Sequence, residues 1–327
     1  QRLVEKTISV KLRYSDGTYQ RDVYSNETGP VQDVQDAPTG AVTLSGGSPP
    51  AEKTTLAANA QQVSDLDGMG DISWEWLANG RIIPSDGSNV LELTQALVGA
   101  RIAARASYRD GLGKVETVTS AETAAVLNVN DPLEGGMTVE GAFEQGRTLT
   151  LRHNISDLDG IPASGPGALS FQWLSNGAPI AGATGLSFVP AQAQVGKTLA
   201  VRASYVDLFG NAHQQLETLS VIENINDAPV SSLRLDGPAF VGATLRRVGG
   251  FSDPDGISSE ALARAQTQWL VGGAPVDNAD ATSLKLDRSM AGKSVTLQVS
   301  YTDAFGADET VSVSVPKVSF AAVAVPV

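Results

Sequence analysis

The sequence has no cysteine among its 327 residues and only two histidines. The lack of cysteine excludes disulfide frameworks, thiolate metal sites and cysteine nucleophiles together. The two histidines, His153 and His213, lie in different parts of the chain, and we expect each to be a solvated strand or loop residue. No serine-hydrolase, P-loop or zinc-protease motif accompanies them. We therefore predict that the chain is not an enzyme.

Basic residues and long apolar runs are also scarce. Lys and Arg total 23 against 36 for Asp and Glu, so the formal net charge is -13. Such a charge repels phosphate backbones, and no basic stripe interleaved with aromatic residues offsets it. No apolar run approaches the roughly 18 to 20 residues that a helix needs to cross a bilayer. We expect no nucleic-acid partner and no membrane insertion in this segment.

Aromatic residues make up only 6% of the chain, although hydrophobic residues make up 42%. Several small cores of Val, Leu, Ile and Ala fit this composition better than one large core. A chain of 327 residues is long enough for three domains of about 100 residues each. Its first residues, Gln1 to Val4, carry neither a start methionine nor an export signal, so we expect a window on a longer protein.

The chain does contain three markers that recur with a long period. A Ser-Asp-x-Asp-Gly loop begins at Ser64, Ser156 and Ser252. A Tyr-x-Asp turn begins at Tyr14, Tyr108, Tyr205 and Tyr301. A short Asp-Pro linker carries Asp36, Asp131 and Asp227. Repetition at this spacing indicates tandem domains.

Each linker precedes a new repeat and therefore marks a domain boundary. We predict complete repeats at 37–130, 131–226 and 227–317. Residues 1–36 are expected to be the C-terminal part of a preceding repeat. The apolar residues 318–327 are either the start of the next repeat, which we favour, or a tail that pairs with a sheet edge.

Within each repeat the pattern is that of short strands. A strand around Trp76, Trp173 or Trp269 leads into a two-residue turn of Asn-Gly or Gly-Gly, which suits a β-hairpin. A later strand alternates apolar and polar residues and ends in the tyrosine of the Tyr-x-Asp turn. The fold class that we predict is all-β, with tandem immunoglobulin-like β-sandwich repeats in an extended array.

The three markers are expected to meet at one end of each sandwich. The Ser-Asp-x-Asp-Gly loop joins strands B and C, the Tyr-x-Asp turn joins strands F and G, and strand A starts at the same end. Asparagine precedes two of the linker aspartates and could add a side-chain oxygen, whereas Gln35 precedes the first and is expected to weaken or reshape that site. The predicted metal ligands are Asp36, Asp65, Asp67, Asp110, Asn130, Asp131, Asp157, Asp159, Asp207, Asn226, Asp227, Asp253, Asp255 and Asp303.

Carboxylates gathered in this way repel one another and raise one another's pKa values unless a cation lies among them. Oxygen ligands in this number, with no histidine or cysteine nearby, favour Ca²⁺ over Zn²⁺, and Mg²⁺ is the weaker candidate. The glycine after each second aspartate suits a sharp turn with positive φ. The alternative is that Asp-x-Asp-Gly is turn chemistry alone, because Asp and Gly dominate turns on their own account.

The combined string of motifs resembles a known family. Asn-Asp-Ala-Pro, Ser-Asp-x-Asp-Gly, Trp-Leu-x-Asn-Gly, Val-Gly-Lys and Ala-Ser-Tyr-x-Asp are similar to the bacterial Ig-like repeats of large type I-secreted RTX adhesins, over almost the whole chain. The linker also looks like the calcium-binding junctions of cadherin-type domains. The glycine-rich nonapeptide of true RTX repeats is absent.

The resemblance implies an extracellular extender segment on a bacterial cell surface, which Ca²⁺ stiffens and which holds a distal ligand-binding domain away from the membrane. Its partners would be the neighbouring repeats of the same chain. One alternative is a subunit of a surface layer or extracellular filament, with other copies as partners. Another is a glycan-binding β-sandwich module, for which Trp74 is the candidate contact because the other repeats have no counterpart of it.

Overall fold

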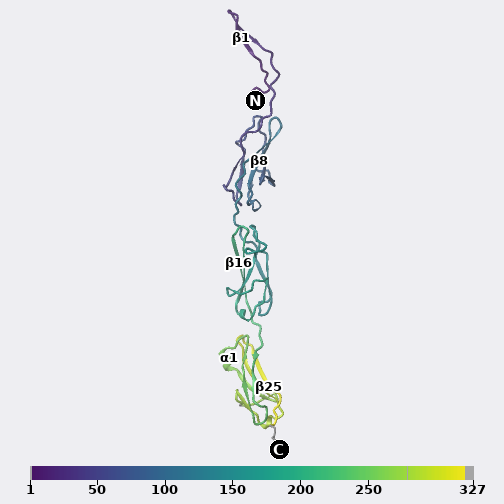
Figure 1. Cartoon of the computed structure of the whole chain (residues 1–327), viewed down its shortest axis with the longest axis vertical. Coiled ribbons are helices and arrows are strands. Elements are labelled where there is room, and N and C mark those ends of the chain that lie inside the picture. Colours follow the sequence, from purple (N-terminus) through teal and green to yellow (C-terminus); the bar gives the residue numbers. More distant parts are fainter. Residues whose placement is uncertain (1, 278, 321–327) are drawn as a thin grey trace. The chain divides into compact units, whose positions relative to one another are not determined.

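The computed structural model describes residues 2–277 and 279–320, and these are almost entirely β structure. Figure 1 shows that the strands gather in separate groups that follow one another along the chain. The strands of each sheet are antiparallel to their neighbours, and each of the three predicted repeats contains a three-stranded and a four-stranded sheet. The prediction of an all-β fold of tandem immunoglobulin-like sandwiches is confirmed.

The first repeat shows the arrangement that the other two restate. Its three-stranded sheet has the order β3 (Thr43–Ser45), β4 (Thr55–Asn59), β7 (Val90–Glu92). Its four-stranded sheet has the order β6 (Arg81–Ile83), β5 (Ser73–Ala78), β8 (Ile102–Arg109), β9 (Val115–Thr119). The Ser-Asp-x-Asp-Gly loop therefore lies between β4 and β5, and the Tyr-x-Asp turn joins β8 to β9.

The second and third repeats use the same order of strands. The second repeat has β10 (Met137–Glu140), β11 (Leu149–His153) and β14 (Ser187–Phe188), and then β13 (Ala178–Pro179), β12 (Ser170–Ser175), β15 (Thr198–Val206) and β16 (Ala212–Val221). The third repeat has β18 (Arg234–Asp236), β19 (Thr244–Val248) and β23 (Ser283–Lys285), and then β22 (Ala274–Pro275), β21 (Gln266–Val271), β24 (Val295–Thr302) and β25 (Asp308–Val315).

Short additional elements complete the chain. A hairpin of β1 (Lys11–Ser15) and β2 (Gln20–Tyr24) precedes the first repeat, and all its strand residues are exposed. The third repeat adds the short strands β17 (Val230–Ser231) and β20 (Phe251–Ser252) and the helix α1 (Ser259–Arg264). Single 3-10 turns at Gln95–Leu97, Gln192–Gln194 and Arg288–Met290 precede the long strands β8, β15 and β24 of the four-stranded sheets. No helix of the described residues is long and apolar enough to span a membrane.

A buried tryptophan joins the two sheets of every repeat. Trp76, Trp173 and Trp269 are at most 1% exposed and lie at the centre of the four-stranded sheets. Each indole N–H donates a hydrogen bond to a backbone carbonyl near the opposite sheet, at 3.0 Å, 2.9 Å and 2.8 Å. The same side chain thus contributes apolar area to the core and satisfies its one donor there.

The contacts of the chain divide it into two compact units. One comprises residues 1–133 together with the loops 157–161 and 207–211, and the other comprises 134–156, 162–206 and 212–327. The predicted repeat boundaries stay predictions, and we keep them as names for the repeats. Val318, one residue beyond the predicted third repeat, is 1% exposed and packs in its core. Residues 321–327 of the predicted tail lie outside the described residues.

Candidate metal centres

The two acidic loops of each repeat lie side by side, as the sequence predicts. Backbone hydrogen bonds join them directly: Gly111 N–H donates to the carbonyl of Asp67 at 2.9 Å. Leu208 donates to Gly160 at 3.1 Å and Ala304 donates to Gly256 at 2.9 Å in the later repeats. The loops are therefore held by the backbone and not by side chains alone.

The Asp-x-Asp-Gly turn closes in the same way three times. The N–H of the second aspartate donates to Oδ1 of the first at 2.9 Å in every repeat. The N–H of the following glycine donates to the carbonyl of that same first aspartate at 3.0 to 3.1 Å. These glycines, Gly68, Gly160 and Gly256, have φ of 91°, 83° and 87°, so the expectation of positive φ is confirmed.

The linker is attached to this turn through the second aspartate. The backbone N–H groups of Asp36, Asp131 and Asp227 each donate to an Oδ2 atom, those of Asp67, Asp159 and Asp255, all at 2.7 Å. One carboxylate oxygen of the loop thus accepts a hydrogen bond that fixes the start of the repeat. We call each linker, its two loops and the adjoining end of the preceding repeat a junction, and number the junctions first, second and third along the chain.

The aspartate of the Tyr-x-Asp turn also accepts backbone hydrogen bonds through one of its oxygens. Oδ1 of Asp110, Asp207 and Asp303 accepts two backbone N–H groups, from the residues two and four positions later, at 2.8 to 3.0 Å. The second oxygen of each carboxylate is left for other contacts. Every junction aspartate of this turn is therefore oriented by the fold before any ligand arrives.

The tyrosine of the same turn orients the first loop aspartate. Tyr108 donates its hydroxyl to Oδ2 of Asp65 at 2.8 Å, and Tyr301 donates to Oδ2 of Asp253 at 2.5 Å. Burial, and then the hydrogen bond to the aspartate, raises the pKa of both tyrosines above the ordinary value of a phenol. The hydroxyls therefore remain donors at neutral pH.

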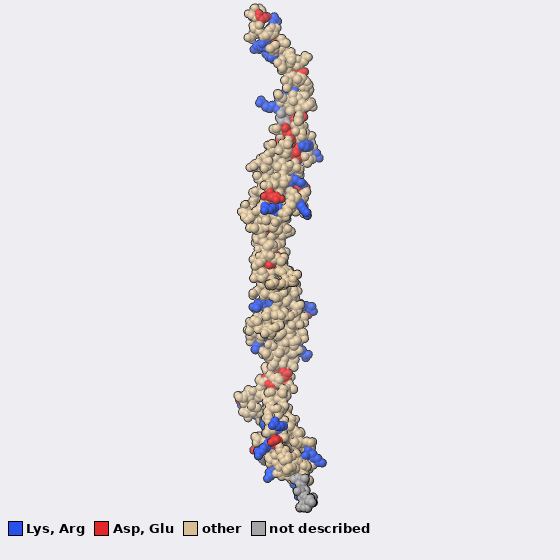
Figure 2. Space-filling model, in the orientation of Figure 1, with Lys and Arg blue, Asp and Glu red and all other residues tan. Residues whose placement is uncertain are grey.

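Burial at the junctions is almost wholly of negative charge. Among the described residues, the eight buried polar or charged side chains are all carboxylates, namely Glu52, Asp110, Glu116, Asp131, Asp159, Asp207, Asp255 and Asp303. The face drawn in Figure 2 is mostly uncharged, with Asp and Glu visible only in scattered patches. Removing a carboxylate from water without a partner costs several kcal/mol, so this burial requires compensation.

Several oxygens at the second and third junctions are buried without a hydrogen-bond partner among the described residues. At the second junction these are Asn128 Oδ1, Asp131 Oδ2 and Asp159 Oδ1. At the third junction they are Asn224 Oδ1, Asp255 Oδ1 and Asp303 Oδ2. Orphaned buried acceptors are rare in folded proteins, and a bound cation is one partner that would satisfy carboxylate oxygens such as these.

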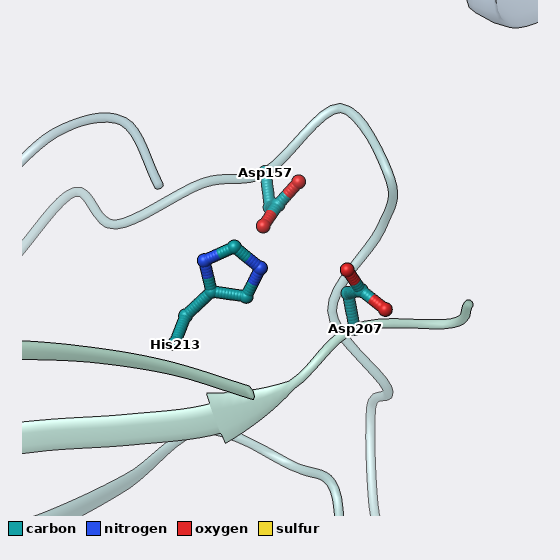
Figure 3. A group of neighbouring side chains, drawn as sticks. All are labelled: Asp157, Asp207 and His213. Carbon is teal, nitrogen blue, oxygen red and sulfur yellow. The ribbon is translucent and has the colours of Figure 1, made fainter. Parts of the chain in front are cut away.

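The acidic groups are close enough to share one ion. Glu52, Asp131 and Asp159 each offer an oxygen within 4.8 Å of the others, and so do Asp253, Asp255 and Asp303. A third group combines Asp157 and Asp207 with His213, whose side chains Figure 3 shows as neighbours. The first two sets contain oxygen donors only, which suits a hard divalent cation, and Ca²⁺ accepts a wider range of coordination geometries than Mg²⁺.

The first junction differs because an amide lies among its carboxylates. Nε2 of Gln35 donates to Oδ2 of Asp67 at 3.2 Å and to Oδ2 of Asp110. Burial acts to raise the pKa of Asp110, but the amide and the backbone N–H groups hold it below the ordinary value. Lys114 also forms an ion pair with the buried Glu116 at 2.6 Å. The Gln35 amide and the Lys114 ammonium thus partly compensate the negative charge of the first junction.

The linkers of the second and third junctions each contain a second asparagine, two residues before the predicted one. Asn130 and Asn226 are exposed, and the Asn226 amide donates to Glu309 at 2.7 Å. The buried orphan oxygens belong instead to Asn128 and Asn224, two residues earlier. The sequence contains the signal, because Asn-x-Asn-Asp occurs in both linkers, but it does not say which asparagine points inward. The ligand role of Asn130 and Asn226 stays a prediction.

Three further junction residues were not foreseen from the sequence. Glu52 and its counterpart Gln145 lie at the end of the preceding repeat, and Gln145 donates its amide to Oδ2 of Asp227 at 2.6 Å. His213 pairs with Tyr205 across β15 and β16, where the other repeats pair tyrosine with Glu116 and Glu309. The expectation of a solvated histidine holds for the exposed His153 but is wrong for the half-buried His213.

No protein-family model and no curated protein matches the chain. Solved structures do match, among them a Ca²⁺-stabilised adhesin with which an Antarctic bacterium binds ice: 14% identity over 95% of this chain and 81% of that one, TM-score 0.29. Human CDH23 EC21-23 matches with 14% identity over 77% of this chain and 91% of that one, TM-score 0.32. Protocadherin gamma B7 cadherin domains 1–4 match with 13% identity over 95% and 83%, TM-score 0.27. Likenesses this low leave the fold to rest on the chain's own strands and sheets.

Proposed function

We propose that this chain is a structural extender segment of a large bacterial cell-surface or secreted adhesin, and that Ca²⁺ bound at its junctions stiffens it. The observation that supports the proposal most directly is the set of buried, unpartnered oxygens at the second and third junctions, three at each. They belong to the linker and to the loops of the following repeat, so an ion that satisfies them ties the linker to that repeat.

The preceding repeat also contributes to the second junction. Glu52, at the far end of the first repeat, is 3% exposed and lies within reach of the same ion as Asp131 and Asp159. An ion held by residues on both sides of a linker removes the freedom of the hinge between two repeats. Repeated along an array, such junctions keep neighbouring repeats in fixed relation, which is what a spacer requires.

The energetic effect of the ion can be bounded. Extracellular modules bind Ca²⁺ with Kd of roughly 10⁻⁴ to 10⁻³ M. Free ion at about ten times Kd stabilises the folded state by roughly 1.4 kcal/mol per site. For a repeat of about 100 residues, a change of this size raises the melting temperature by roughly 5 to 10 °C.

The extracellular and adhesin parts of the proposal rest on the family resemblance of the motifs and on the need for millimolar free Ca²⁺. The filament alternative needs contacts with other copies of the chain, which no described residue singles out. The glycan alternative depends on Trp74, which is half-buried and packs against the core of the first repeat. Neither alternative is favoured by a specific contact, and the extender is the function that the junctions support best.

Thermal unfolding and small-angle X-ray scattering, each in 5 mM Ca²⁺ and again in excess chelator, test the proposal. We expect chelation to lower the melting temperature by roughly 5 to 10 °C and to give a shorter, more flexible average particle. Mg²⁺ at the same concentration serves as the control for charge screening and should restore less than half of the difference.

Unchanged melting and unchanged particle dimensions on chelation would remove calcium from the proposal and leave only the tandem sandwich fold. Equal restoration by Mg²⁺ would contradict the proposed preference for Ca²⁺ over Mg²⁺.

A further inference from the structure

Lys53 at the second junction has an unusual backbone conformation. Its φ is 63°, in the left-handed region that favours glycine. The equivalent residues of the other repeats are glycines, Gly146 with φ of 71° and Gly242 with φ of 95°. The equivalence is fixed by one hydrogen bond, since the N–H groups of Lys53, Gly146 and Gly242 donate to Leu93, Pro190 and Leu286 at 2.7 to 2.8 Å. A lysine here is strained where its counterparts are not.

The side chain of Lys53 reaches directly into the carboxylate cluster. Its Nζ lies 2.6 Å from Oδ1 of Asp131 and donates to the carbonyl of Val129 at 3.3 Å. The hydrogen bond to Asp131 and, to a smaller extent, the charges of Asp131, Glu52 and Asp159 raise the pKa of the ammonium above its ordinary value. Its side chain is 46% exposed, so it can leave the cluster for solvent, whereas that of Asp131 is only 6% exposed.

Among the described contacts, no basic side chain is paired with the aspartates of the third junction, and Arg264 is paired with Glu260 instead. The neutral Gln145 takes the place of Glu52, and Gly146 takes the place of Lys53. Both side chains accept from the linker in the same way: Val129 N–H donates to Oε2 of Glu52 and Ile225 N–H donates to Oε1 of Gln145, each at 3.4 Å. The second junction thus has an additional carboxylate and a tethered positive charge, and in the described part of the chain the third junction has a glutamine and a glycine at the same two positions.

From this difference we infer that Lys53 is a built-in counter-ion of the second junction, which holds the linker when Ca²⁺ is scarce and which Ca²⁺ must displace. This inference rests on the proposed function, because it assigns a competitor to the same ion site. Its consequence is a graded array. In chelator the linker of the second junction stays attached, and a higher Ca²⁺ concentration is needed to occupy its ion site. The attachment of the linker at the third junction depends more strongly on the ion.

Hydrogen exchange followed by mass spectrometry resolves the two junctions within one intact chain. Peptides that cover residues 127–133 report the second junction, and peptides that cover 223–229 report the third. In chelator, we expect stronger amide protection of the wild-type second junction than of the third, and a higher Ca²⁺ midpoint for its full protection. The Lys53→Asn variant removes the charge and keeps a residue that tolerates positive φ. It should lose the amide protection of the second junction in chelator. It should also lower the Ca²⁺ midpoint roughly two- to fivefold, which corresponds to the strength of a partly exposed ion pair.

Two control variants show whether the effect comes from the charge at position 53. One keeps that charge on a different side chain, and the other changes the net charge elsewhere in the chain. Lys53→Arg keeps the cation and should keep the protection in chelator. Lys285→Asn removes a positive charge from the exposed end of β23, outside the junctions, and should leave both midpoints unchanged. If Lys53→Asn retains wild-type protection in chelator, or leaves the midpoint of the second junction unmoved, the inference is wrong while the calcium proposal stands. If neither junction of the wild type responds to Ca²⁺, the proposed function itself falls and the inference falls with it.

Discussion

At the scale of single residues, the junction aspartates divide their oxygens between the backbone and the candidate site. Asp255 accepts the linker N–H through Oδ2 and leaves Oδ1 buried without a partner. Asp303 accepts two turn N–H groups through Oδ1 and leaves Oδ2 in the same condition. Turn chemistry alone, the alternative for Asp-x-Asp-Gly, accounts for the first oxygen of each residue but not for the second.

The substitution Asp255→Asn separates these two tasks. In Ca²⁺ we expect it to weaken binding at the third junction about tenfold and to remove most of the roughly 1.4 kcal/mol of ion-dependent stability. In chelator the variant should be as stable as the wild type or more stable, because one of several repelling carboxylates is gone. Thermal unfolding in both buffers measures this, with the exposed Asp236→Asn of β18 as the control. Destabilisation of equal size in both buffers would contradict an ion-ligand role.

The substitution Tyr301→Phe tests the positioning of Asp253. It removes the donor of a 2.5 Å hydrogen bond and leaves a carboxylate oxygen in a partly buried site. Because the bond is made with or without an ion, we expect a loss of about 1.5 kcal/mol in both buffers, within the range for hydrogen bonds to charged groups. Chemical denaturation of the variant measures the loss, and Tyr19→Phe, on a side chain that is 68% exposed, should cost nothing measurable. A loss confined to Ca²⁺ buffer would show that the hydroxyl acts only through the ion.

Residue types and spacing in the sequence were sufficient to predict the aspartates, but not the remainder of the site. Asp131 and Asp159 belong to recurring motifs, so their meeting follows once the sandwich is recognised. Glu52 has no motif of its own, and its approach to Asp131 depends on how one repeat ends where the next begins. The Oδ1 atom of Asn128 is buried whereas Asn130 is exposed, and spacing alone does not predict which of the two is buried.

At the scale of elements, the turns follow their sequences closely. Asn79 and Asn176 have φ of 51° and 47° and each is followed by a glycine with positive φ, as the type I′ hairpin turn requires. Their side chains accept a hydrogen bond from the backbone N–H of Arg101 and Thr198, both at 2.9 Å. The loop between Gly256 and β21 in the third repeat contains α1, which Ser258 caps by accepting from Ala261 N–H at 3.0 Å.

The third repeat offers a stabilising substitution at its hairpin turn. Gly272 has φ of 57° and stands where the other repeats have asparagine. In Gly272→Asn a new Cβ would lie 3.3 Å from Cδ of Lys293, a flexible side chain that can shift. We expect the third repeat to gain about 0.5 kcal/mol, because asparagine tolerates this φ and has less freedom than glycine when unfolded.

Denaturant unfolding of Gly272→Asn measures the gain, and the reverse substitution Asn176→Gly in the second repeat is the matched control. The control should lose a similar amount, because it gives up both the conformational restriction and the hydrogen bond to Thr198. A destabilised Gly272→Asn would mean that the contact with Lys293 outweighs the turn preference.

At the scale of the whole molecule, the junctions are unlike one another although the repeats are alike. The first junction has the Gln35 amide among its carboxylates, the second has Lys53 beside Asp131, and the third has no basic side chain paired with its aspartates among the described contacts. The sandwich cores were predictable because each repeat buries its own apolar face. The differences between junctions were not, because each depends on one or two substitutions at positions that carry no motif.

Limited proteolysis should reveal this order of junctions in the whole chain. With an elastase-type protease, which cuts beside small and aliphatic residues, we expect chelator to open the linkers and release fragments of about 100 residues, the size of one repeat. Cutting should be fastest near Ile225 and Ala228 in the third junction and slower near Val129, where Lys53 holds the linker without an ion. In 5 mM Ca²⁺ both linkers should resist for at least ten times longer, and a chromogenic peptide checks that the protease itself is equally active in both buffers. Mass spectrometry of the fragments locates the cuts. Equal cutting rates at the two linkers in chelator would contradict the claim that Lys53 holds the second linker without an ion. Equal cutting rates with and without Ca²⁺ would contradict the binding of Ca²⁺ at the junctions.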